Sequence, residues 1–111
     1  MVTACGLVFS LPLRGSVPRG LDDIIFDYVA ASQCGVLTAE IERGFHTEWA
    51  AVTARLGLSP NQARVFRVKG WIAAERKWRD HPAIGPRATC QTEGAAAATR
   101  FSEIAAGALV P

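Results

Sequence analysis

The chain has 111 residues, of which half are apolar and 20% are charged, and its formal net charge is +2. This length is typical of one domain with a single hydrophobic core, and the composition excludes a disordered tail. No run of about 18 apolar residues occurs, so a transmembrane helix and a membrane partner are not expected. The small net charge by itself does not indicate a class of partner.

The first 20 residues differ from the rest of the chain. Met1–Leu13 is mostly apolar, as in a secretory signal peptide, but the first cation, Arg14, follows the apolar run instead of preceding it. Helix-breaking residues then recur at Pro12, Gly15, Pro18 and Gly20. We therefore expect residues 1–20 to be a loosely ordered extension, with a signal peptide as the alternative.

The cysteines are Cys5, Cys34 and Cys90, an odd number at wide spacing and without a CxxC pair. This pattern argues against a secreted disulfide framework and against a zinc finger. We therefore expect a reducing, cytoplasmic setting. Cys34, next to Gly35, is predicted to be a buried thiol at the end of a helix.

Apolar spacing predicts the first helices. Apolar residues recur with helical spacing from Leu21 to Val29, and Gly35 is suited to end that helix. A second, short helix is expected from Thr38 to about Gly44, and another from Thr47 to Gly57. Glu40, Glu42 and Glu48 are interpreted as a solvated acidic face.

The strongest local signal surrounds Ser59. Ser59 is a preferred N-cap residue, Pro60 suits the first helical position, and Gln62 completes a capping box. A long helix is therefore predicted from Pro60 to about Arg79, where His81-Pro82 stops it. Beyond it we expect a loop with a short strand at residues 87–91, and then a helix over 93–108 with an apolar stripe at Phe101, Ile104 and Ala105. The expected class is all-α, with at most that one strand.

Charge is unevenly distributed along the chain. Residues 20–50 hold six acidic side chains and one basic one, whereas residues 55–79 hold seven basic side chains and one acidic one. A basic block is suited to phosphates if it folds onto one face, although a solvated helix surface is the alternative.

Together these features predict a helix-turn-helix in a DNA-binding domain at residues 21–80. Its small core is expected to contain Val52, Leu56, Leu58, Ala63 and Phe66. The residues placed to contact DNA bases are Asn61, Gln62, Arg64 and Val65. The residues placed to contact phosphates are Arg55, Ser59, Arg67 and Lys69. An ordinary helical hairpin is the alternative.

The stretch GFHTEWAAVTARLGLSPNQARVFRVKGWIAAE, preceded by AEIERG, resembles the helix-turn-helix of plasmid repressors of the TrfB/KorA family. The similarity covers about residues 21–90 and is carried mainly by Leu56, Gly57, Leu58, Ser59, Trp71 and Glu75. It implies a homodimeric repressor of plasmid or mobile-element operons that binds a palindromic operator. It also implies that residues 81–111 contain the dimerisation segment, at Arg87–Gly107.

Two observations limit this resemblance. Arg64 and Val65 stand where the family pattern has small polar residues, which implies a different operator. The Leu-Gly-Leu-Ser turn also occurs in sigma factors and two-component regulators, so it does not define one family.

The predicted helix at 60–79 is apolar on two sides. Ala63, Phe66, Gly70 and Ala73 form one side, and Val65, Val68 and Ile72 form the other. A helix of this kind is normally buried on both sides. This favours the alternative function, a helical protein-interaction module such as an antitoxin-like protein or a phage adaptor.

No residue pattern indicates an enzyme, a cofactor or a small-molecule substrate. His46, His81 and the cysteines match no metal-ligand spacing, and no P-loop or GxGxxG motif occurs. Trp49, Trp71 and Trp78 are expected in the core or at an interface.

Overall fold

The computed structural model describes residues 14–15, 19–80 and 89–111. Most of these residues lie in four α-helices, which are α1 (Leu21–Gln33), α2 (Ala39–Arg55), α3 (Pro60–Arg79) and α5 (Ala95–Ala105). A π-helical turn, η2 (Cys90–Gly94), leads into α5, and two-residue strands β1 (Arg14–Gly15) and β2 (Leu109–Val110) pair in parallel. The predicted all-α class is confirmed.

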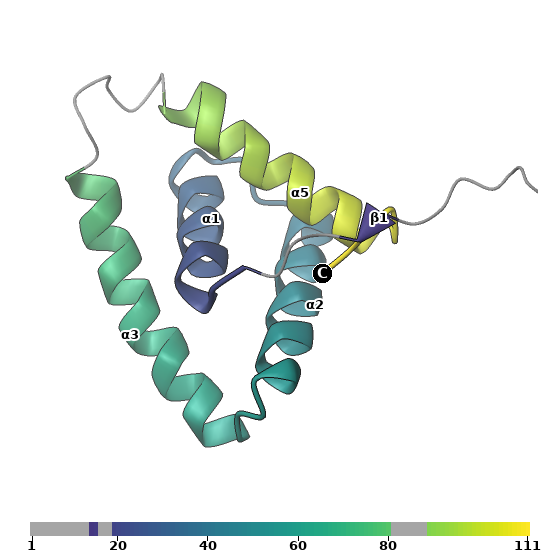
Figure 1. The fold of residues 1–111 in the computed structure, drawn as a ribbon. Coiled ribbons are helices and arrows are strands. Elements are labelled where there is room, and N and C mark those ends of the chain that lie inside the picture. The colour runs from purple at the N-terminus through teal and green to yellow at the C-terminus, as the bar shows by residue number, and fades with distance from the viewer. Residues whose placement is uncertain (1–13, 16–18, 81–88) are drawn as a thin grey trace, which may run out of the picture.

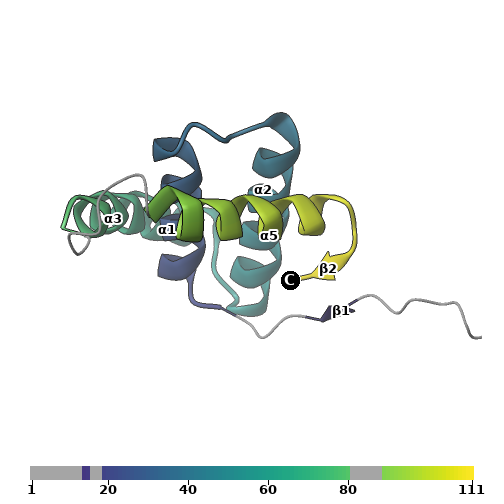
Figure 2. The same cartoon turned by 90° about the horizontal axis from the view of Figure 1, so that it is seen from above.

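The helices form an open V with one helix inside it. α2 and α3 diverge from their connecting turn, α1 lies between them, and α5 crosses the open end of the V (Figure 1). Viewed from above, α5 passes over α1 and α2, while α3 lies to one side (Figure 2). α3 packs mainly on α1, and α2 packs mainly on α5. The α2–α3 turn is thus at the end of the molecule opposite α5.

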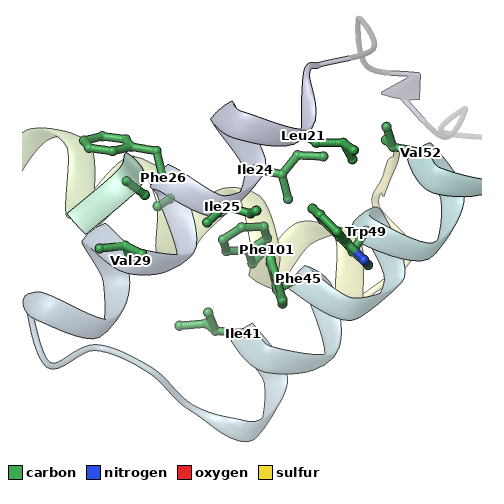
Figure 3. Packing of buried hydrophobic residues seen from close by; sticks show 12 residues of the cluster. Leu21, Ile24, Ile25, Phe26, Val29, Ile41, Phe45, Trp49, Val52 and Phe101 are labelled. Atoms are coloured by element: carbon green, nitrogen blue, oxygen red, sulfur yellow. The ribbon is translucent and has the colours of Figure 1, made fainter. Parts of the chain in front are cut away.

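The core is built around α1, whose apolar spacing predicted one buried stripe. Ile24 and Ile25 are completely buried, and Phe26, Ala30 and Ala31 are buried as well, because α1 has neighbours on several sides. Phe45 of α2 and Phe101 of α5 meet edge to face beside them, with ring centroids 5.9 Å apart (Figure 3). Burying an aliphatic or aromatic side chain of this size contributes about 1.5–3 kcal/mol.

α2 is a single helix, so the prediction of two helices that break at Gly44 was wrong. Thr38 is its N-cap, as expected, and its Oγ1 accepts a hydrogen bond from the backbone N–H of Ile41. Gly44 does not end the helix. It is the point at which α2 approaches α5, since a Cβ there would lie 1.9 Å from the carbonyl oxygen of Phe101.

Glu48 was predicted on a solvated face, but its side chain is only 1% exposed. Its carboxylate accepts hydrogen bonds from Arg19, at 2.7 Å, and from Arg100 of α5, at 2.5 Å. Arg19 also forms an ion pair with Asp27 of α1. A signal was present in the sequence, because Glu48 falls in the same helical stripe as Ile41, Phe45 and Val52.

A few residues of the expected N-terminal extension also make contacts. Within residues 1–20, Arg14 and Gly15 pair with Leu109 and Val110, and Arg19 joins the buried ion-pair cluster. Residues 1–13 and 16–18 lie outside the described part of the chain, so the prediction there stays a prediction.

The cysteine prediction was wrong for two of the three residues. Cys34, at the end of α1, forms a disulfide with Cys90, at the start of η2. Thr89 is helical and Cys90–Gly94 is π-helical, so the strand expected at 87–91 is absent from residues 89–91, while 87 and 88 lie outside the described residues. Gly94 allows the close packing here, since a Cβ would lie 2.7 Å from the sulfur of Cys34.

Candidate nucleic-acid interface

α3 begins as the sequence predicted. The backbone N–H of Gln62 donates to Ser59 Oγ at 3.1 Å, and the N–H of Ser59 donates to Gln62 Oε1 at 2.8 Å, which completes the capping box. Gly57 has a φ of 68°, a left-handed conformation that favours glycine and sets the direction of the turn. The first turns of α3 therefore project in a defined direction.

All four side chains predicted to contact bases are exposed on these turns: Asn61, Gln62, Arg64 and Val65. Two of them hydrogen bond to each other, since Arg64 Nη1 donates to Asn61 Oδ1 at 2.9 Å. Bidentate recognition of adenine needs both the oxygen and the nitrogen of an amide. The Oε1 of Gln62 is held by the capping box, and the Oδ1 of Asn61 by Arg64, so such recognition requires these bonds to exchange.

The predicted phosphate contacts do not all lie together. Lys69 and Ser59 are exposed, and so is Arg55, which donates to the carbonyl oxygen of Pro111 at 3.1 Å. Arg67 is half-buried, and its guanidinium carbon lies 5.2 Å from the centroid of the Phe45 ring of α2. Lys69 is two positions after Arg67, or about 200° around the helix, so the two side chains point to opposite sides.

The predicted helix-turn-helix core is not formed as expected. Val52 is buried, whereas Leu56 is 58% exposed and Phe66 is 49% exposed. Leu58 and Ala63 are half-buried. The reason is that α1 occupies the space between α2 and α3, and α2 has its main contact with α5.

The two apolar sides of α3 differ in how far they are buried. The buried side centres on Gly70 and Ala74, and Ala73 and Phe66 of the predicted first face are exposed. The second face stays open, since Val65, Val68 and Ile72 are 52–56% exposed. The side chains of this second face, which we call the outer stripe, have no neighbouring helix among the described residues.

The basic block is only partly a shared surface. Arg64, Lys69, Arg76 and Arg79 are exposed on α3, and the Lys77 ammonium lies 4.5 Å from the centroid of the Phe26 ring. Acidic residues come close to one edge, because the position of a Cβ on Gly70 is 3.5 Å from Asp22 Oδ1 of α1. Arg64, Lys69, Arg76 and Arg79 lie more than about 90° around the helix from Gly70, on the side of α3 that faces away from α1.

Within residues 14–15, 19–80 and 89–111, no three histidine, cysteine or acidic side chains gather as metal ligands. The helices in the same residues are too short or too polar to span a membrane. His81 lies outside them. The tryptophan prediction is confirmed, since Trp49 is buried and Trp71 and Trp78 pack against the core.

Comparison of the chain with protein-family models, with curated proteins and with solved structures finds no match.

Proposed function

We propose that this protein is a sequence-specific DNA-binding transcriptional repressor that acts as a homodimer on a palindromic operator of a plasmid or mobile-element operon. The observation that carries the proposal is the sharply capped start of α3, at the end of the molecule opposite α5, with Asn61, Arg64 and Val65 all exposed. An exposed helix of this width fits the major groove, and these side chains match base edges there.

The basic residues on the outward side of α3 support the same function. Lys69 and Arg76 are exposed beside the outer stripe, and cations there would meet phosphates on either side of the groove. The half-buried position of Arg67 over Phe45 removes it from the phosphate contacts that we propose. Double-stranded DNA is thus the partner that we expect, with contacts from one side of α3.

The resemblance implies that residues 87–107 form the dimer surface, and the burial of this segment limits which of its sides is available. Phe101 and Ile104, the apolar residues of the 87–107 segment, are buried inside the protomer against α2 and α1. A homodimer through this segment therefore uses the opposite side of α5, where Ala95, Ala96 and Thr99 are exposed.

A repressor acts where DNA is, so the proposal places the protein in the cytoplasm. The Cys34–Cys90 disulfide is uncommon there, because cytoplasmic reductants keep thiols reduced. Alkylation of the protein in intact cells tests this point. Labelling of all three cysteines supports a reduced cytoplasmic protein, whereas protection of Cys34 and Cys90 contradicts it.

A gel-shift titration over salt tests DNA binding, with a site selected from a random pool of duplexes. We expect affinity to fall steeply with salt, and Lys69→Ala to reduce the slope by about one phosphate contact. Arg64→Ala should weaken binding and relax the preference at one base. Arg43→Ala, an exposed arginine near the other end of α2, is the matched control. The proposal is contradicted if the affinity for DNA does not depend on salt concentration. It is also contradicted if Arg43→Ala and Lys69→Ala change that salt dependence equally.

A helical protein-interaction module is the second candidate, favoured by the outer stripe of Val65, Val68 and Ile72. Exposed apolar residues at heptad-like spacing are typical of a helix that binds another helix. The double variant Val68→Ser/Ile72→Ser separates the two functions. The module is favoured if the parent protein has no affinity for nucleic acid but co-purifies with another protein, and the double variant loses that protein. The repressor is favoured if DNA binding is lost in Arg64→Ala and kept in the double variant.

A further inference from the structure

A hollow opens beside the α2–α3 turn, on the side of α3 that faces α1. It has a volume of about 560 Å³ and is lined by apolar residues of α1, α3 and the α2–α3 turn and by two carboxylates at one edge: Leu21, Leu56, Leu58, Phe66, Asp22 and Asp23. This volume is within the range of about 300–1,000 Å³ that is typical of small-molecule sites. The hollow is separate from the outer stripe, because Phe66 and Val65 project from different sides of α3.

Two of the large apolar side chains that line the hollow are about half exposed to solvent. Leu56, in the α2–α3 turn, is 58% exposed, and Phe66, in the second turn of α3, is 49% exposed. Leu21 closes the floor, at 9% exposed. Binding of an apolar molecule that removes this surface from water is favourable by about 25 cal/mol per Å² of apolar surface buried.

The carboxylates decide which apolar molecule fits. Asp22 and Asp23 are exposed at the edge of the hollow, and neither forms an ion pair with any cation of the described residues. Asp22 is directed toward α3, since its Oδ1 is 3.5 Å from the Cβ position of Gly70. No basic side chain lines the hollow among the described residues, so the only formal charges at its edge are the two carboxylates.

We propose that this hollow binds a small hydrophobic cation, with an aromatic or alkyl body against Leu56, Leu58 and Phe66 and a primary ammonium against Asp22 and Asp23. The ammonium supplies three donors, and two carboxylates supply the matching acceptors. The inference is independent of DNA binding, because it uses neither the outward side of α3 nor its basic residues.

Three naphthalene probes that differ only in their head group test the proposal: naphthylmethylammonium, naphthylmethanol and naphthoate. Each is titrated into the ¹⁵N-labelled full chain, and the shifts of backbone amides are followed. We expect the ammonium to bind about fivefold or more tightly than the alcohol, and the carboxylate to bind most weakly. The shifts should centre on residues 20–23, 56–58 and 66.

Variants separate the two parts of the site. Phe66→Ala should weaken binding of the ammonium and of the alcohol alike, by about tenfold. Asp22→Asn/Asp23→Asn should lower the affinity for the ammonium to that for the alcohol and leave the alcohol unchanged. Val65→Ala, next to Phe66 and similarly exposed, is the control and should change neither. Thermal melts of each variant verify that it is folded.

Three results would overturn the proposal. The first is equal affinity for the three probes, which would show apolar adsorption without a role for the carboxylates. The second is a set of shifts centred on the outer stripe, which would place binding on the other side of α3. The third is the absence of binding at probe concentrations up to about the millimolar range, where even weak small-molecule sites are occupied.

Discussion

Gly44 of α2 lies directly against the backbone of Phe101 of α5, so closely that a Cβ at residue 44 would stand 1.9 Å from the Phe101 carbonyl oxygen. This contact brings together two residues that are more than 50 positions apart in the chain. It also positions Glu48, one turn further along α2, beside Arg100 of α5. The crossing of α2 and α5 is therefore a determinant of the whole fold.

Gly44→Ala is expected to destabilise the protein, because the new methyl group collides with backbone atoms that cannot move aside. Removal of a glycine from a helix alone would stabilise it by about 1 kcal/mol, so a net loss of about 2 kcal/mol or more shows the collision. Gly70→Ala is the comparison, since the closest atom to its Cβ, at 2.5 Å, would be the flexible end of the Ile25 side chain. Chemical denaturation measures both, and a Gly44→Ala variant at least as stable as the parent would contradict the contact.

Glu48 is expected to make folding sensitive to acid. Burial acts to raise the pKa of Glu48, but hydrogen bonds and charges from Arg19 and Arg100 outweigh it and hold that pKa below its usual value of 4.5. A lowered pKa contributes stability that is present above about pH 4.5 and is lost as pH falls through the value in the folded protein. Burial raises the pKa of Asp27, against the effect of Arg19, so Asp27 opposes this trend in the same pH range.

The variant Glu48→Gln isolates the contribution of Glu48. At pH 7 it should lower the free energy of unfolding by about 3 kcal/mol or more, because two arginines lose a buried partner. The difference between parent and variant should shrink as pH falls from 5 to about 3. A difference that is constant over this range would show that the Glu48 carboxylate does not titrate as described. Glu42→Gln, exposed on α2, is the control.

The disulfide is expected to contribute strongly to stability. Cys34 and Cys90 are 56 residues apart, and closure of a loop of that length lowers the entropy of the unfolded chain, which raises its free energy by about 4 kcal/mol at 25 °C. Cys34→Ser/Cys90→Ser should therefore melt at a clearly lower temperature than the parent under oxidising conditions. A thiol reductant should lower the melting temperature of the parent toward that of the variant and leave the variant unchanged. Cys5→Ser, which keeps the pair, should behave like the parent.

The outer stripe is expected to tolerate polar residues. Ile72 is 54% exposed, so Ile72→Ser should change the free energy of unfolding by less than about 1 kcal/mol. Ile25→Ala, at a fully buried position of α1, should lower it by about 2–5 kcal/mol. Urea denaturation at several protein concentrations measures both. A large loss in Ile72→Ser that grows with protein concentration would show that the stripe is covered by a second copy.

Local signals in the sequence were sufficient to predict several helix boundaries. The start of α3 follows from Ser59, Pro60 and Gln62, because a capping box needs only residues within one turn. The end of α1 near Gly35 follows from the freedom of glycine to adopt a φ of 70°. Exposure of Asn61, Gln62, Arg64 and Val65 was predicted for the same reason, since the cap defines the orientation of the first turn.

The pairing of the helices was decided by the tertiary structure. Gly44 was interpreted as a helix end because the sequence does not reveal that the backbone of Phe101 approaches it. Leu56 and Phe66 were assigned to a core that α1 displaces by lying between α2 and α3. Glu48 and Cys34 were assigned to solvent and to a free thiol because their partners, Arg100 and Cys90, are more than 50 residues away.

The physical reason for this division is the range of the interactions. Caps, turns and apolar periodicity act within about one or two helical turns, so the order of residues determines them. Close approach, buried ion pairs and disulfides depend on which helices meet, and a composition with apolar residues on several sides of α1 and α3 allows more than one arrangement. The sequence by itself therefore determined that α3 is a capped, exposed and basic helix. The tertiary structure decided which of its sides is covered, and left the outer stripe and the hollow beside Phe66 open.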